Sequence, residues 1–321
     1  MRFGIFTPDD LPLHSQWLHA FAEGLQLRGV NYQINSLEEG YRPCDVVVTF
    51  GIPKLRTPRG RAIQHVLRKH KDCSAAAKNI VIELGFVHRD RYFMVGWGGL
   101  NGRADFRNDG CSSDRWNQLG VEPAPWRVTG DHIVLCGQVP WDASVQHRNH
   151  AQWCRETAIE LRKYSDRPIV FRPHPLQPDA IDMAGTPVQV SNKASLREDL
   201  DNAWAVVTFN SNAGVEATLA GIPAFVADRG AMGYKILNRN LALIESPNLP
   251  DRTQWLYDLA YTQWTLDELA RGETIDHLFL QGAPLTVRLR CGIRQFASRT
   301  QAAVRKSKRR ALSSLGGKRA A

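Results

Sequence analysis

The stretch from residue 205 to residue 227 reads AVVTFNSNAGVEATLAGIPAFVA, and its pattern of residue types decides the fold. Its apolar run at 205–209 is typical of a strand buried on both faces. A polar turn follows at 210–212, and the small and apolar residues at 213–220, closed by a glycine, predict a helix. A second apolar run at 223–227 predicts the next strand. A strand, a helix and a strand in this order indicate a parallel β-α-β unit.

The same alternation of strands and helices continues on both sides of this unit. We expect strands at 131–136, 168–171 and 187–190 and helices at 150–163, 195–202 and 253–271. In the predicted helix at 195–202, Ser195 is followed three residues later by Glu198, which is the spacing of a capping box. Residues 126–284 are therefore predicted to form one α/β domain.

The N-terminal part of the chain repeats this order of elements. We expect strands at 2–7, 44–50 and 79–84 and helices at 15–28 and 60–70. The length of 321 residues also suits two domains, at roughly 100–200 residues per domain. The predicted fold class is α/β, with two tandem doubly wound (Rossmann-like) domains at 1–125 and 126–284, followed by a basic tail at 285–321.

The composition excludes several classes of protein. Hydrophobic residues make up 43% of the chain, which argues against disorder throughout, and no apolar run approaches the roughly 20 residues of a membrane span. The six cysteines form no C-x-x-C pair, and the N-terminus does not resemble a secretion signal. We expect reduced thiols and a cytoplasmic protein. We also see no His/Cys cluster with the spacing of a metal site.

The net charge of +9 is unevenly distributed along the sequence. Residues 285–321 contain eleven Arg or Lys residues and no Asp or Glu, so residues 1–284 carry a net charge of −2. The chain is therefore expected to have a near-neutral body and a cationic tail.

Polar residues that directly follow predicted strands are the first candidates for a site, since ligands in open α/β sheets bind at the carboxyl ends of the strands. In the second domain this rule selects Gln138, Arg172, His174, Asn210, Ser211, Asn212, Gly214 and Glu216. The turn at 210–212 precedes a helix whose N-terminal N–H groups could bind a phosphate, although it could equally be a plain helix cap. Arg172 offers a fork for phosphate, and His174 could donate to it or pack against a helix.

The first domain offers candidates for a general base. Glu83 and His88 flank the end of the strand predicted at 79–84, and His88 could also be a surface or structural residue. Asp9 and Asp10 are a weaker pair after the first strand. The glycine-rich segment at 96–103 could cradle a phosphate or serve as a long loop between domains.

Two motifs resemble those of a known enzyme group. Arg-Pro-His-Pro at 172–175 and FNSNAGVEATLAGIPA at 209–224 are similar to the C-terminal domain of GT-B fold glycosyltransferases, most of all the bacterial capsule Kdo-transferase and sialyltransferase group. Glu-Leu-Gly-Phe at 83–86 is similar to a strand end of the Kdo transferases. The resemblance implies a transferase that moves a sugar from a nucleotide sugar, with His174 and the 210–212 turn on the donor phosphates and a first-domain base. We expect no cofactor beyond this co-substrate, and no metal.

For the acceptor, the first expectation is a hydroxylated pyrimidine base in DNA. The basic residues Arg305, Lys306, Lys308, Arg309 and Arg310 would suit duplex DNA, and some bacteriophages carry small GT-B enzymes that glycosylate hydroxylated pyrimidines in DNA. An anionic membrane surface, as in capsule or lipopolysaccharide assembly, is the alternative. The tail could also be a solubilising segment without a partner. A non-catalytic nucleic-acid-binding protein is a third hypothesis, and no protein partner is inferred.

Overall fold

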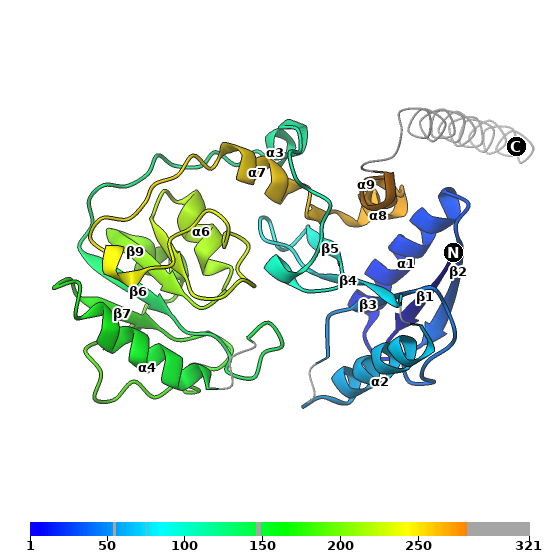
Figure 1. Cartoon of the computed structure of the whole chain (residues 1–321), viewed down its shortest axis with the longest axis horizontal. Coiled ribbons are helices and arrows are strands. Elements are labelled where there is room, and N and C mark those ends of the chain that lie inside the picture. The colour runs from blue at the N-terminus through cyan, green and yellow to red at the C-terminus, as the bar shows by residue number, and fades with distance from the viewer. Residues whose placement is uncertain (54–55, 75, 146–148, 281–321) are drawn as a thin grey trace, which may run out of the picture.

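The computed structural model describes residues 1–53, 56–74, 76–145 and 149–280. Within these ranges the chain forms two α/β domains that lie side by side, each built on its own β-sheet (Figure 1). None of the helices in these ranges combines the length and the apolarity that crossing a lipid bilayer requires. The predicted fold class, two Rossmann-like domains in tandem, is confirmed.

The first sheet has the strand order β11-β5-β4-β3-β1-β2. Its strands are β1 (Arg2–Thr7), β2 (Asn31–Ser36), β3 (Val46–Phe50), β4 (Lys78–Leu84), β5 (Phe93–Trp97) and β11 (Gln263–Trp264). The helices of this part are α1 (Pro12–Leu27), α2 (Pro58–Cys73) and α3 (Asp114–Leu119), with the 3-10 helix η1 (Asn101–Arg103). The four strands β1 to β4 are parallel, whereas β5 runs antiparallel to β4 and β11 antiparallel to β5.

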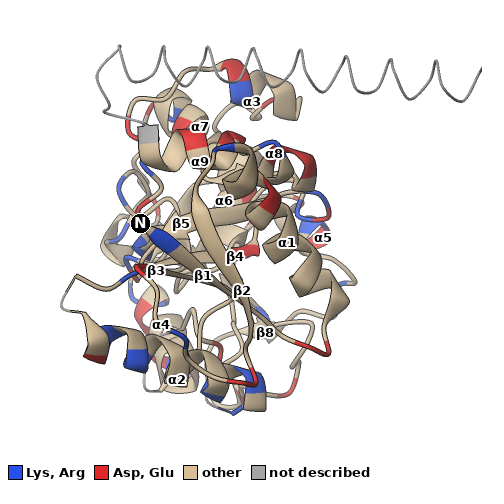
Figure 2. Ribbon diagram, turned by 90° about the vertical axis from the view of Figure 1, so that its right-hand side faces the viewer, with Lys and Arg blue, Asp and Glu red and all other residues tan. Residues whose placement is uncertain are grey.

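Helices cover both faces of the first sheet because its strands are apolar on both sides. Val46 and Val48 of β3 face the core under α1, and Val47 between them packs with Ile63 and Val66 of α2. In Figure 2, α2 lies below the strands of this sheet, whereas α8 (Leu266–Ala270) and α9 (Glu273–Leu280) lie above them.

The second sheet has the strand order β10-β9-β6-β7-β8, and all its described pairs are parallel. Its strands are β6 (His132–Cys136), β7 (Ile169–Arg172), β8 (Gln189–Val190), β9 (Ala203–Thr208) and β10 (Ala224–Val226). Its helices are α4 (His150–Leu161), α5 (Leu196–Leu200) and α6 (Ala213–Leu219), with the 3-10 helix η2 (Leu241–Leu243). The predicted capping box is present: Ser195 Oγ accepts from the Glu198 N–H, and Glu198 accepts from the Ser195 N–H.

The continuous helix predicted over 253–271 is wrong. Helix α7 (Thr253–Ala260) ends at Tyr261, and β11 then joins the first sheet beside β5. Helix α8 begins after Thr265, which forms a second capping box with Glu268. The predicted range 126–284 therefore does not fold as one domain, since its last part crosses back to the first domain (Figure 1).

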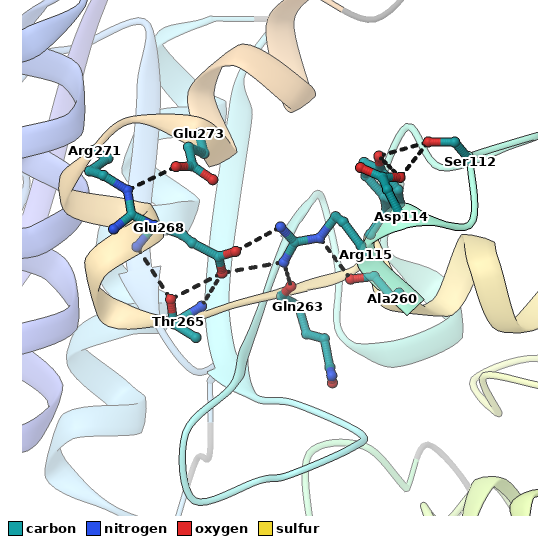
Figure 3. Close-up of polar contacts among 10 residues, drawn as sticks. Ser112, Asp114, Arg115, Ala260, Gln263, Thr265, Glu268, Arg271 and Glu273 are labelled. Atoms are coloured by element: carbon teal, nitrogen blue, oxygen red, sulfur yellow. Dashed lines mark hydrogen bonds and ion pairs between the residues drawn. The ribbon is translucent and has the colours of Figure 1, made fainter. Parts of the chain in front are cut away.

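A buried arginine fastens this returning segment, as Figure 3 shows. Arg115 of α3 donates from Nη1 to Glu268 Oε1 at 2.8 Å and from Nη2 to the Gln263 carbonyl oxygen at 2.9 Å. Its guanidinium carbon lies 3.9 Å from the centroid of the Trp264 ring. Farther along, Arg28 of α1 forms two hydrogen bonds to the Asp276 carboxylate of α9. These contacts make the returning segment a part of the first domain.

Candidate active site

A cavity of about 280 Å³ lies where the two domains meet. Both sheets contribute the residues that follow the carboxyl ends of their strands, as expected for open α/β sheets. Six of the predicted site residues line it: Glu83, Gln138, His174, Asn210, Ser211 and Asn212. The cavity thus brings the predicted base and the predicted donor residues together from opposite domains.

The second-domain wall is the turn between β9 and α6, and hydrogen bonds fix it. Asn210 is 3% exposed, and its backbone N–H donates to Gln138 Oε1 at 3.0 Å. Gln138 Nε2 in turn donates to Asn210 Oδ1 at 2.9 Å. The Ser211 hydroxyl oxygen accepts from the Ala213 N–H at 3.2 Å, at the start of α6. Gln138 and Asn210 therefore hold the turn in place, and Ser211 and Asn212 are the residues it presents.

His174 lines the same cavity just after β7. The backbone N–H of Leu176 donates to His174 Nδ1 at 3.2 Å, so the neutral ring carries its proton on Nε2. Burial lowers the pKa of His174, the nearby Asp142 carboxylate opposes this shift, and the Arg89 guanidinium adds to it. The lowered pKa favours the uncharged ring, which can donate one hydrogen bond from Nε2.

Glu83 is the acidic residue of the first-domain wall. It stands near the end of β4, and its Oε1 accepts from the neighbouring Leu84 N–H at 3.1 Å. Gly51, at the end of β3, has a φ of +77° and lies so close that a Cβ there would be 3.2 Å from Glu83 Oε2. The positive φ favours a glycine at this turn, and a larger residue would also crowd the Glu83 carboxylate.

Residues from the returning segment support this wall. The side chain of Gln263, fully buried in β11, accepts at Oε1 from the N–H groups of Phe86 and Val87, at 2.7 and 3.0 Å. Its Nε2 donates to the Val87 carbonyl oxygen at 3.1 Å. Phe86 lines the cavity, and its own carbonyl oxygen accepts from Asn212 Nδ2 at 3.2 Å. The strand end that carries Glu83 is therefore tied both to β11 and to the opposite domain.

The other predicted site residues lie outside the cavity lining. Arg172 Nη1 donates to Asp199 Oδ2 at 2.5 Å, in a pair whose carboxylate side chain is 3% exposed. His88 has a φ of +48°, and its Nε2 bonds the Leu119 carbonyl oxygen at 3.0 Å. Gly214 is buried in α6, and Glu216 accepts from Asn212 Nδ2 at 3.1 Å. Two residues that the sequence assigned to chemistry are thus engaged elsewhere, Arg172 by Asp199 and His88 by the Leu119 carbonyl oxygen.

The structure also places the weaker candidates, which are the pair Asp9 and Asp10 and the glycine-rich segment at 96–103. Asp9 accepts from the Ser36 hydroxyl at 3.0 Å, and neither Asp9 nor Asp10 lines the cavity. The glycine-rich segment packs against the second domain: the Gly102 N–H donates to the Gly230 carbonyl oxygen at 2.9 Å, and a Cβ at Gly102 would be 2.5 Å from the Ala231 oxygen. These contacts favour the interpretation of this segment as a loop between the domains over its interpretation as a phosphate cradle.

Several residues of the site were missed in the sequence. Arg89, Asn101, Asp142 and Ser144 all line the cavity. Outside the cavity lining, Arg56 of the first domain lies 4.8 Å from the centroid of the Trp141 ring of the second. Arg89 follows His88, and Asp142 lies in the loop after β6, so the strand-end rule covers both regions. Nothing in residue type alone singled them out.

One pair of possible metal ligands is present in the sequence. Asp199-Leu200-Asp201 has the D-x-D spacing of some cation-binding transferases, which the sequence reasoning overlooked. In the structure, Asp199 binds Arg172 and accepts from the Ser191 hydroxyl at 2.7 Å, so its carboxylate is already engaged. Among the described residues there is no group of three His, Cys, Asp or Glu side chains arranged to hold a metal ion.

The tail residues Arg305, Lys306, Lys308, Arg309 and Arg310 lie outside the described residues. The described body has a local basic surface of its own, on α2. The exposed side chains Arg61, Arg68, Lys69 and Lys71 lie on this helix, and Asp72 is its one acidic residue. Figure 2 colours the basic and acidic positions along the ribbon. The near-neutral net charge of the body therefore hides a basic helix.

No model of a known protein family matches the sequence, and no characterised protein is significantly similar to it in sequence. Solved structures are similar in fold. Thermosulfurimonas dismutans KpsC, named as a β-Kdo 2,7-transferase, superposes with a TM-score of 0.52 at 14% identity, over 87% of this chain and 99% of that chain. The same organism's KpsC β-Kdo 2,4-transferase gives 0.49 at 13% identity, over 83% and 92%. The first of these similarities is one of fold, and it agrees with the two Rossmann-like domains of the GT-B type described above.

Proposed function

We propose that this chain is a glycosyltransferase that moves a sugar from a nucleotide-sugar donor to a hydroxyl acceptor. One observation carries the proposal: a carboxylate of one domain, Glu83, lines the same cavity as the neutral His174 and the Ser211–Asn212 turn of the other. The first-domain wall offers this carboxylate and the Arg89 guanidinium, and the second-domain wall offers hydrogen-bond donors beside the Asp142 carboxylate. The donor itself would be the co-substrate, and no further cofactor is needed.

The second-domain wall would bind the donor phosphates. His174 can donate from Nε2 without carrying a charge, and the Ser211 hydroxyl can also donate. Both amide hydrogens of Asn212 are already used, by the Phe86 carbonyl oxygen and by Glu216. As the bond between the sugar carbon and the phosphate oxygen breaks, negative charge develops on that oxygen. Donors that are already oriented stabilise this charge at little cost of reorganisation.

The first-domain wall would serve the acceptor. Glu83 would take the proton of the acceptor hydroxyl while the oxygen forms its bond to the anomeric carbon. The electron pair of the broken bond leaves with the nucleotide phosphate, so the transfer balances without a metal ion. Metal independence stays a proposal, and transfer that survives excess EDTA would support it. Loss of transfer that Mn²⁺ or Mg²⁺ restores would contradict it.

For the acceptor we favour a hydroxyl group of a saccharide, as in capsule or lipopolysaccharide assembly. The KpsC structure that shares the fold is named as a transferase of the sugar Kdo, and on this basis we favour carbohydrate chemistry here. The similarity in fold alone does not decide the sugar, so donor and acceptor must be found by experiment.

A hydroxylated base in duplex DNA is the second candidate acceptor. The eleven basic residues of 285–321 and the basic helix α2 favour a polyanion. Truncation before residue 299 removes eight positive charges, and each lost phosphate contact should reduce the salt slope of DNA binding by about 0.9. If the full chain binds anionic vesicles and shows no salt-dependent DNA binding, the saccharide acceptor at a membrane surface is favoured. DNA binding without any transfer would favour a non-catalytic nucleic-acid-binding protein.

The direct test of the proposed function starts with a panel of nucleotide sugars and a thermal-shift measurement, since a bound donor stabilises the folded state. With the donor that binds, Glu83→Gln should lower kcat by about 100-fold or more, as loss of a general base does, and leave donor affinity unchanged. His174→Ala should weaken donor affinity instead. Glu23→Gln, on the exposed face of α1, is the matched control. Absence of binding across the panel, or full activity of Glu83→Gln, would contradict the proposal.

A further inference from the structure

A chain of polar contacts runs from the first domain to the turn on the second-domain wall. Arg103 of η1 donates from Nη2 to Asp228 Oδ2 at 2.7 Å, and both side chains are 18% exposed. The other carboxylate oxygen, Asp228 Oδ1, accepts from Asn210 Nδ2 at 2.8 Å and from the Gly230 N–H at 2.9 Å. One carboxylate thus joins a guanidinium of the first domain to the residue that begins the 210–212 turn.

Asn210 is fully engaged by the protein. Its Nδ2 donates both to Asp228 and to the Ser144 carbonyl oxygen at 2.9 Å, so both amide hydrogens are used. Its Oδ1 accepts from Gln138 Nε2. Asn210 is therefore an unsuitable ligand for a donor phosphate. Its bonds instead fix the direction in which the chain enters Ser211 and Asn212, which line the cavity.

The sequence leaves just enough room for this connection at Gly230. A Cβ at this position would overlap Arg103 Nη1 and would lie 2.7 Å from Asp228 Oδ1 and 2.9 Å from Asn210 Nδ2. A side chain here would therefore separate all three members of the chain of contacts. Gly230 permits the close approach of the two domains at this point.

We propose that Arg103 is a positioning residue, which sets the orientation of the Ser211–Asn212 turn through Asp228 and Asn210. The reason is electrostatic: without the guanidinium, the part-buried Asp228 carboxylate loses its charged partner and keeps neutral donors only. Asn210 then loses its fixed position, and the turn loses its orientation with it. The affinity of the second domain for its ligand therefore depends on a residue of the first. The ligand in this statement is the nucleotide sugar, so that part rests on the proposed function.

Two variants test the proposal by different routes. Arg103→Gln removes the charge, and Gly230→Ala displaces the guanidinium by bulk without changing any charged residue. Arg107→Gln is the matched control, because Arg107 also pairs with an aspartate, Asp105, at an exposed site on the same loop, at 3.0 Å. Arg103→Lys keeps the charge and should therefore retain part of the positioning role.

Hydrogen exchange of the amides at 209–214 provides a measurement that needs no ligand. We expect it to accelerate several-fold in Arg103→Gln and Gly230→Ala and to stay as in the unmodified chain in Arg107→Gln. With the nucleotide sugar that the panel identifies, we expect the Kd and the KM for the donor to rise about tenfold while kcat changes little. Unchanged exchange at 209–214, or a uniform loss of protection over the whole second domain, would overturn the proposal. If the exchange is altered in the variants but the unmodified chain binds no nucleotide sugar of the panel, the positioning role is supported. Only the proposed function is then contradicted.

Discussion

The two sheets of the molecule differ in where the chain supplies their strands. The second sheet takes β6 to β10 from one contiguous stretch, and all of its described strand pairs are parallel. The first sheet takes an edge strand, β11, from a segment that follows the whole second domain. The second sheet can form from consecutive β/α units of the chain. The first sheet is complete only after the chain returns from the second domain and adds β11.

The two walls of the cavity differ in the same way. The 210–212 turn is held by Gln138 and Asp228 of its own domain, with Arg103 reaching in from the other. The strand end that carries Glu83 depends on Gln263, about 180 residues away in sequence. The donor wall should therefore tolerate damage to the returning segment, and the acceptor wall should not. We call this difference between the two walls the asymmetry.

The largest effect is expected at Arg115. Although burial alone would raise the pKa of Glu268, the hydrogen bond and the charge of Arg115 hold it below its ordinary value. Arg115→Met leaves this carboxylate buried without its partner, which costs about 3–5 kcal/mol. Chemical denaturation should show the first domain unfolding at lower denaturant concentration, with little change in the second domain.

Two further variants serve as comparisons for Arg115→Met. Arg107→Met removes an exposed pair and should cost no more than about 1 kcal/mol. The double variant Arg115→Met/Glu268→Gln should be less destabilised than Arg115→Met alone, because no unpaired charge remains. Equal destabilisation of both domains by Arg115→Met would contradict the asymmetry.

A smaller effect that depends on pH is expected at His277 of α9. Burial lowers its pKa to about 4, against the ordinary 6.5, while a hydrogen bond of 2.8 Å to the Phe106 carbonyl oxygen opposes the shift. Between these two values the unfolded chain binds more protons than the folded one, so the free energy of unfolding falls as the pH falls from 6.5 to 4. The loss reaches about 3 kcal/mol at most, and above pH 6.5 this group contributes no pH dependence.

The measurement is the free energy of unfolding as a function of pH, by denaturation, for the unmodified chain and for His277→Gln. The variant should lose the part of the pH slope between 4 and 6.5 that belongs to His277. A slope that is identical in both proteins would show that His277 is not the group responsible.

The elements with strong local patterns could be predicted from the sequence. The apolar run of β3, the capping box at Ser195 and the strand, turn and helix at 205–220 are all present as predicted, because burial and capping act within a few residues. The resemblance to GT-B transferases also gave the right fold, and its longest motif, 209–224, lies in one β-α-β unit. The rule for strand ends placed six of the predicted residues at the cavity.

The remaining features depend on contacts between distant segments. A strand of two residues, Gln263–Trp264, has no periodicity to detect, and only the Thr265–Glu268 capping pair could have indicated the helix break. Arg172 shows a different limit. The rule for strand ends gives a position along the sheet, but β7 directs this side chain to Asp199 instead of the cavity. Pairing partners on other helices decide such cases, and they are invisible before the fold is known.

The smallest and most specific effect is expected at Gln263. Gln263→Met keeps the size of the side chain and removes its three hydrogen bonds to Phe86 and Val87, at a cost of about 1–3 kcal/mol for the buried backbone groups left unsatisfied. Because these groups hold the wall that carries Glu83, we expect kcat to fall about tenfold and the Kd for the donor to stay the same. The matched control is Gln254→Met, at an exposed glutamine of α7. A variant that loses donor affinity as strongly as kcat would mean that the two walls are not independent. In that case the returning segment would position the whole cleft, and the difference between the two domains would be one of chain order only.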